Sequence, residues 1–256
     1  MVIEYLIGDK RYLLTPTVFF AAGALYSLIS TVFAIILFPS SASTSHVLLA
    51  TVAVAPLIFK AIVVGAHILD REPHRVLAVQ SWLLSIYLAY MLGAVIGFQV
   101  AYIATPQQLR YTLLQEQINE LEIIEGVRIK LTGMAVKDAM FWIILTNNLR
   151  VYLLSILLSF IYGTGGMLLL NWNASILATL FLQKLHSNPL AYILRIFPHT
   201  LFEFLGYFTG GITGVLIGVA LIQEGWNRRL LKDVTLLFLL GIGFILLGAL
   251  IESGFI

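Results

Sequence analysis

The chain has no cysteine and little charge. The absence of cysteine from its 256 residues excludes disulfides and thiol chemistry. Only 11% of the residues are charged while 60% are hydrophobic, a balance that leaves a water-soluble domain of this size without enough polar surface. The net charge of +2 is too small, and the basic residues too scattered, to indicate a nucleic-acid partner. A lipid bilayer is therefore the expected environment.

The sequence also lacks the motifs of common enzymes and channels. It contains no phosphate-binding glycine loop, no G-x-S-x-G nucleophile elbow, no His-Glu-x-x-His pair and no run typical of a selectivity filter. These absences predict a protein that is not an enzyme and needs no cofactor. The alternative to a protein without a cofactor is one that binds a divalent metal such as zinc. With five histidines and no cysteine, its ligands would be nitrogen and oxygen atoms.

Long apolar runs predict membrane-spanning helices, because a helix needs roughly 20 apolar residues to cross the hydrocarbon core. Seven stretches meet this requirement, at residues 16–38, 46–69, 76–104, 139–161, 166–184, 197–222 and 234–252. The first follows two basic residues as a signal peptide would, but its 23 residues are too many for such a peptide, so we expect a retained span. Asn171 and Asn173 interrupt the fifth stretch, which makes a broken or re-entrant helix the alternative there. The predicted fold is an all-α, multi-pass transmembrane bundle of six to seven spans.

Residues 105–138 form the one long stretch outside the predicted spans. Thr105 is the expected N-cap of a helix there, with Pro106 at its first position, Gln108 as the capping-box acceptor and Gly126 as its stop. An apolar stripe follows one face of this amphipathic arm, through Leu109, Leu113, Leu114, Ile118, Leu121 and Ile124. The stripe predicts either an arm that packs on its own bundle or a surface for a protein partner or a second copy of the chain.

The distribution of lysine and arginine bears on orientation in the cell membrane. If the chain crosses the membrane seven times, the numbers of lysine and arginine residues on the two sides are nearly equal. The short loops slightly favour a cytoplasmic N-terminus, with the arm outside the cell.

Polar side chains inside the predicted spans are candidate functional residues, because such groups are costly in lipid unless they have partners. The fourth span carries Asn147, Asn148 and Arg150, and Ser155 and Ser159 share a helical face with Asn148. The alternative to a functional role is that the asparagines join helices by hydrogen bonds while the arginine bonds carbonyl groups.

The sixth span places an acid and an imidazole on a face lined with glycine. Pro198 is the expected first residue of this helix, and His199 and Glu203 follow one turn apart. Four glycines continue the same face and predict close helix packing: Gly206, Gly210, Gly214 and Gly218.

Alternating spans bring these polar residues into one leaflet. The start of the fourth span, the start of the sixth and the end of the seventh then lie on the same side of the membrane. We therefore predict an intramembrane polar pocket formed by Asn147, Asn148, His199, Glu203 and Glu252. Three uses of the pocket stay open: helix packing, a proton or ion path, and a metal site with His199, Glu203 and Glu252 as candidate ligands.

The order of these motifs resembles a known family. Asn147-Asn148-Leu149, then a glycine-rich turn, then Pro198-His199-Thr200-Leu201-Phe202-Glu203 and a glycine-rich helix are similar to the stage II sporulation protein M family over roughly residues 75–255. The chain has Thr200 where the family usually has glycine. On this basis we expect residues 1–74 to be a two-span N-terminal extension and residues 75–256 to be the family's membrane domain.

The resemblance implies a role rather than a reaction. The family's namesake acts as a membrane scaffold for cell-wall-degrading partners during engulfment, so the leading hypothesis is a scaffold or partner-recruiting component of the cell envelope. The matching residues are Asn147, Asn148, His199 and Glu203. An ion- or proton-coupled transport component is the second hypothesis, and a membrane-embedded metal-dependent hydrolase is the third.

Overall fold

The structure is a computed structural model, and it describes residues 14–71, 76–130, 135–184, 189–223 and 228–255. Seven of the helices in these ranges are long and apolar enough to cross a membrane. Each overlaps one of the predicted stretches, so the all-α transmembrane fold class is confirmed. The described chain divides into two compact units, residues 1–114 and 115–256. The division expected at residue 74/75 stays a prediction.

The first unit contains the spans α2 (Pro16–Leu37), α3 (Ala42–Arg71) and α4 (Val76–Ala104), with the short 3₁₀ turn η2 (Pro39–Ser41) between α2 and α3. The Thr15 hydroxyl caps the start of α2 by accepting a hydrogen bond from the Val18 amide. The spans α2 and α4 make the most extensive helix pair in the unit.

Glycine determines how closely α2 and α4 approach. A Cβ atom at Gly93 or Gly97 would clash with the backbone of Phe20 or Ala24 on the opposite helix, and one at Gly23 would clash with the Tyr90 carbonyl. Backbones come this close only where small residues face each other, which is a common way of packing helices in lipid.

A buried histidine lies between α3 and α4. His46 Nδ1 is 2.7 Å from the Ala42 carbonyl oxygen, and its Nε2 is 2.9 Å from the Tyr102 hydroxyl. A carbonyl oxygen only accepts, so Nδ1 carries the proton and the neutral ring accepts at Nε2 from Tyr102. Both ring nitrogens therefore have partners inside the first unit.

The arm forms a helix, α5 (Gln107–Lys130), whose ends differ from the prediction. Thr105 does not cap it, because its hydroxyl donates instead to the Ala101 carbonyl at 2.8 Å, in the last turn of α4. Gly126 does not stop it either, and a single glycine is tolerated inside a helix. Within the second unit, the buried Gln117 side chain of α5 donates to Ser175 on the span α7 at 3.3 Å.

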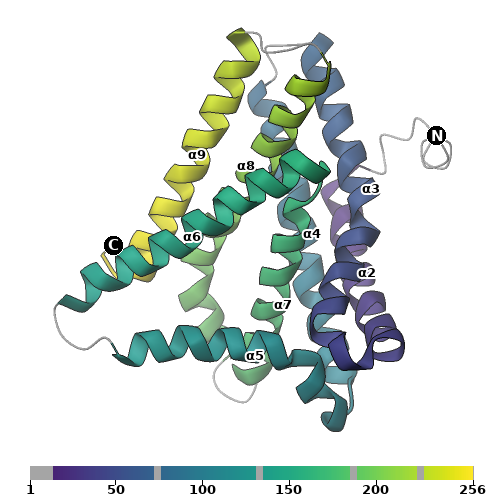
Figure 1. Cartoon of the computed structure of the whole chain (residues 1–256), viewed down its shortest axis with the longest axis vertical. Coiled ribbons are helices and arrows are strands. Elements are labelled where there is room, and N and C mark those ends of the chain that lie inside the picture. The colour runs from purple at the N-terminus through teal and green to yellow at the C-terminus, as the bar shows by residue number, and fades with distance from the viewer. Residues whose placement is uncertain (1–13, 72–75, 131–134, 185–188, 224–227, 256) are drawn as a thin grey trace. The chain divides into compact units, whose positions relative to one another are not determined.

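The second unit contains α6 (Ala135–Tyr162), α7 (Gly166–Lys184), α8 (Pro189–Gln223) and α9 (Arg228–Glu252). The spans α8 and α9 are packed against each other, and α6 runs obliquely across both (Figure 1). The turn from α6 to α7 contains Gly163 at φ 69°, a left-handed conformation that favours glycine.

The fifth span is confirmed and its broken or re-entrant alternative is wrong, as is the predicted start of the sixth span. α7 is one continuous helix through Asn171 and Asn173, because the Asn173 side chain bonds the Leu169 carbonyl within the same helix. Pro198 does not begin α8, which starts nine residues earlier at Pro189. Pro198 is exposed, and α8 continues through it, as membrane helices often do at a proline.

Candidate functional site

The centre of the site is Asn148, which joins α6 to α8. Its Nδ2 donates a hydrogen bond of 2.7 Å to Glu203 Oε1, and its Oδ1 accepts one of 2.9 Å from the Tyr207 hydroxyl. Asn148 is 5% exposed. One amide thus satisfies an acid and a phenol that lie a turn apart on α8.

The third helix of the site is α9, which brings in Glu252. The carboxyl group of Glu252 lies close to that of Glu203. α9 approaches α8 closely at this level because Gly248 faces Glu203: a Cβ there would lie 2.9 Å from Glu203 Cγ.

Two other predicted pocket residues lie at the margin of this cluster. Asn147 is exposed, and its Nδ2 reaches Asn148 Oδ1 at the long distance of 3.4 Å. His199 lies one turn before Glu203 and is partly buried, and its carbonyl oxygen would be 3.3 Å from a Cβ at Gly248 of α9. The structure thus brings Asn148, Glu203 and Glu252 together, with Asn147 and His199 beside them.

The polar row continues along α6 below Asn148. The buried Ser155 hydroxyl donates to the Tyr207 carbonyl at 3.0 Å, and the Ser159 hydroxyl accepts from the Gly166 amide at 2.9 Å. The Tyr152 hydroxyl donates to the Phe238 carbonyl of α9 at 2.9 Å. Each of these groups bonds backbone, so this part of the face ties helices together.

The predicted glycine face of α8 contacts two helices. A Cβ at Gly206 would lie 2.6 Å from Ile245 Cδ1 of α9, whereas Gly210, Gly214 and Gly218 face Tyr152, Ile156 and Phe160 of α6. At Gly214 the added atom would clash with the Ile156 carbonyl. These approaches bring α6 near enough to α8 for a short asparagine side chain to reach Glu203.

The candidate metal ligands do not form a complete site in the described part of the chain. No group of three or more His, Asp or Glu side chains there is placed to hold a metal ion. Structural zinc usually takes four protein ligands and catalytic zinc three.

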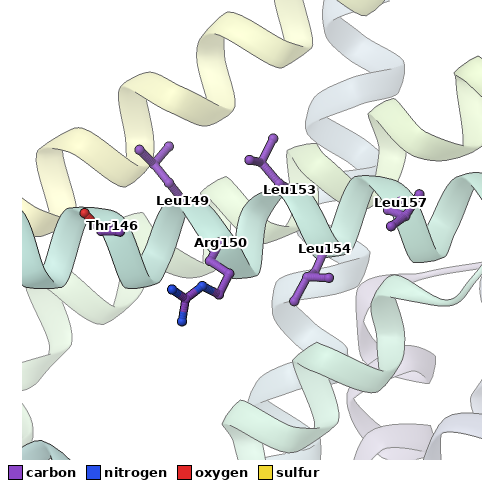
Figure 2. Close-up of a pocket in the computed structure, with 6 residues that line it drawn as sticks. All are labelled: Thr146, Leu149, Arg150, Leu153, Leu154 and Leu157. Atoms are coloured by element: carbon purple, nitrogen blue, oxygen red, sulfur yellow. The ribbon is translucent and has the colours of Figure 1, made fainter.

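A hollow of about 460 Å³ lies along α6 itself, away from the polar cluster. Its lining residues are Thr146, Leu149, Arg150, Leu153, Leu154 and Leu157. Figure 2 shows the Arg150 side chain extending from the helix on the same side as Leu154, with Leu149 and Leu153 on the other side of the view.

Comparison with known families matches the model described as stage II sporulation protein M to residues 17–256. The chain belongs to the stage II sporulation protein M family. The match is wider than the resemblance over residues 75–255, since it includes the first two spans. Comparison with curated proteins and with solved structures finds no match.

This member of the stage II sporulation protein M family also uses a site residue that the sequence analysis did not select. Tyr207 lies one turn after Glu203 and is 3% exposed. Its position was a usable signal, because residues four apart share a helical face and a tyrosine hydroxyl buried in lipid needs a partner.

Proposed function

We propose that this protein is a non-enzymatic, multi-pass component of the cell membrane that recruits protein partners. The spans form its scaffold, and the partners bind its outer surfaces. The N-terminus is cytoplasmic in this proposal and the arm is external. The role agrees with that implied by the resemblance to the family's namesake.

The observation that carries the proposal is that the intramembrane polar groups are used within the bundle. Asn148 bonds both Glu203 and Tyr207, and Glu203 lies close to Glu252. The hollow along α6 includes none of these residues. Polar groups that hold three spans together stabilise a rigid scaffold and are unavailable to a substrate.

The arm offers a second argument for recruitment. Along α5, Tyr111 is 67% exposed and Ile123 is 62% exposed, although α5 is not one of the membrane-spanning helices. The predicted apolar stripe is largely buried, at Leu113, Leu114 and Leu121, so these exposed side chains and not the stripe are available to a partner.

The test measures the size of the complex that the full chain forms in its own membrane. Native membranes are crosslinked, and the mass of the tagged complex is compared for the wild type and for a variant in which a glycine-serine linker of equal length replaces residues 106–125. We expect the complex to shrink to the bare chain in the variant. A matched control replaces two buried arm residues, Leu113→Met and Leu121→Met, and should retain the complex. An unchanged complex in the linker variant would contradict recruitment through the arm.

A second candidate function is proton-coupled transport, favoured by the closeness of the Glu203 and Glu252 carboxyl groups. Neighbouring carboxyl groups inside a membrane are typical of proton relays. The test is proton flux into liposomes that contain the purified chain. Flux that disappears in Glu203→Gln and persists in Glu122→Gln, on the exposed face of the arm, would support transport. Equal flux in liposomes with and without protein would refute it.

A further inference from the structure

Arg150 lies near the middle of a membrane span. The apolar part of α6 runs over 25 residues, Lys137–Ile161. At 1.5 Å per residue, Arg150 is about 16 to 20 Å along the helix axis from either end. Its side chain is exposed, and among the residues that the structure describes it has no hydrogen bond or ion pair. A guanidinium at this depth is costly without a partner.

Lipid phosphates lie too far away to be that partner. Membrane helices tilt by up to about 40°, and such a tilt still leaves Arg150 about 12 to 15 Å from either end of the span. An arginine side chain near a helix end reaches the interface by snorkelling, but it is shorter than this distance. The partner must therefore lie within the hydrocarbon layer.

The surface around Arg150 is suited to another helix. The hollow beside it is lined by leucines from successive turns of α6, and Leu153 and Leu157 are 53% and 49% exposed. At 100° per residue, Arg150 points about 160° away from Asn148, so this face lies opposite the polar cluster. The packing of α6 on α8 consequently leaves the arginine face uncovered within the second unit.

A second copy of the chain does not supply a matching acid. Within the described spans, Glu203 is the one acidic residue away from a span end, and it is bonded to Asn148 on the opposite side of α6. Asp138, Asp233 and Glu252 lie at the ends of their spans. The complementary charge must come from a different protein.

We propose that this face of α6, from Thr146 to Leu157, binds a transmembrane helix of a different protein, one that carries an aspartate or glutamate at mid-membrane depth. The acid pairs with the Arg150 guanidinium, and apolar side chains of the incoming helix pack between the leucines. This inference rests on the proposed recruiting function and names the chemistry of the partner.

The test uses synthetic peptides as the partner. The full chain, labelled with a fluorescent donor at Thr164→Cys, is reconstituted in phosphatidylcholine vesicles, where the lack of native cysteine makes the label unique. A leucine-rich transmembrane peptide with a central glutamate and an acceptor dye is titrated, beside the same peptide with glutamine. We expect the glutamate peptide to bind about tenfold more tightly than the glutamine peptide.

The variants identify the contact. Arg150→Leu should abolish the preference for glutamate, and Arg150→Lys should retain it. Arg150→Glu should reverse it in favour of a lysine peptide. Leu153→Ala should weaken binding of both peptides, whereas Leu239→Ala, at a similarly exposed leucine of α9, should leave binding unchanged.

Three results would overturn the proposal. The first is equal binding of the two peptides, or no binding of either, by the wild type. The second is loss of the glutamate preference when phosphatidylglycerol is added, since the guanidinium would then pair with lipid phosphate. The third is a photocrosslink from a benzophenone side chain placed at Leu153 to another helix of the same chain, since the face would then be covered within the chain itself.

Failure of this inference is distinguishable from failure of the recruiting function. If the native complex keeps its size in Arg150→Leu, recruitment stands and the α6 face is not its site. If the wild type forms no complex in its own membrane, the recruiting function fails whatever the peptides do.

Discussion

Asn148 Nδ2 and Glu203 Oε1 are 2.7 Å apart, and the hydrogen bond between them joins α6 to α8 across 55 positions of the chain. The same asparagine accepts from Tyr207, so removing its amide leaves two polar groups of α8 without this partner. Loss of a partner in a buried site costs more than the net value of the bond that is lost.

We therefore expect Asn148→Ala to lower the unfolding free energy of the protein by about 1 to 2 kcal/mol. The measurement is equilibrium unfolding in detergent micelles or bicelles. Asn147→Ala is the matched control and should cost less than about 0.5 kcal/mol, because Asn147 is exposed and makes one long contact. Equal losses in the two variants would contradict the assignment of Asn148 as the centre of the cluster.

Tyr207→Phe tests whether the cluster acts as one network. The variant keeps the ring and loses the hydroxyl that donates to Asn148 at 2.9 Å. We expect a loss of about 1 kcal/mol, and a coupling of at least about 0.5 kcal/mol in a double-mutant cycle with Asn148→Ala. Strict additivity would show that the two side chains act independently.

The glycine contacts of α8 predict a strong effect of one added methyl group. In Gly214→Ala the new Cβ would clash with the Ile156 carbonyl of α6, so the helices must separate. We expect a loss of about 2 kcal/mol in unfolding free energy. Gly243→Ala is the control, since nothing lies within 4 Å of its added Cβ, and it should change stability by less than about 0.5 kcal/mol. A larger loss at Gly243 than at Gly214 would contradict the packing described.

The first unit has its own test at the buried histidine. Tyr102→Phe removes the hydroxyl that donates to His46 Nε2 at 2.9 Å, and should destabilise the contact of α3 with α4 by about 1 kcal/mol. Hydrogen exchange should rise in these two helices and stay unchanged in α8 and α9. Nitrogen chemical shifts of His46 should show the proton on Nδ1 in the wild type, and a proton on Nε2 instead would refute the bond to Ala42.

The proposed orientation is tested with single cysteines, which the native chain lacks. Glu122→Cys on the exposed face of the arm should react with a membrane-impermeant maleimide added to intact cells. Thr164→Cys, between α6 and α7, should react only after the membrane is opened. The reverse pattern would place the N-terminus outside the cell, contrary to the orientation that the distribution of lysine and arginine favours.

The helices were largely predictable because their signal is local. A span needs a run of apolar residues as long as the hydrocarbon core is thick, and α4 begins and ends where that run does, at Val76 and Ala104. The ends that were mispredicted depend on neighbours. Pro198 is exposed and lies inside α8, which extends nine residues further back to Pro189, and the Thr105 hydroxyl was free either to cap α5 or to bond the end of α4.

The residues of the candidate site were easier to predict from the sequence than the contacts between them. Depth in the membrane and helical face selected Asn148, Glu203 and Glu252, because both follow from spacing along the chain. Asn148 shares a helical face with Ser155 and Ser159, and this polar face indicated which asparagine points inward: these three residues are buried and Asn147 is exposed. Tyr207 was missed because a lone tyrosine in a span is commonly an interface residue.

The sequence by itself determined the lipid environment, the all-helical class and the approximate spans of this protein. Each of these follows from the length of the apolar runs and from their lack of charge. The tertiary structure alone decided which polar groups meet. Asn148 reaches Glu203 because glycines on α8 let α6 come close, and Arg150 then points the opposite way. Hydrogen bonds form only at about 3 Å. Helix packing therefore decides which polar side chains far apart in the chain come close enough to bond, and the residue types alone do not.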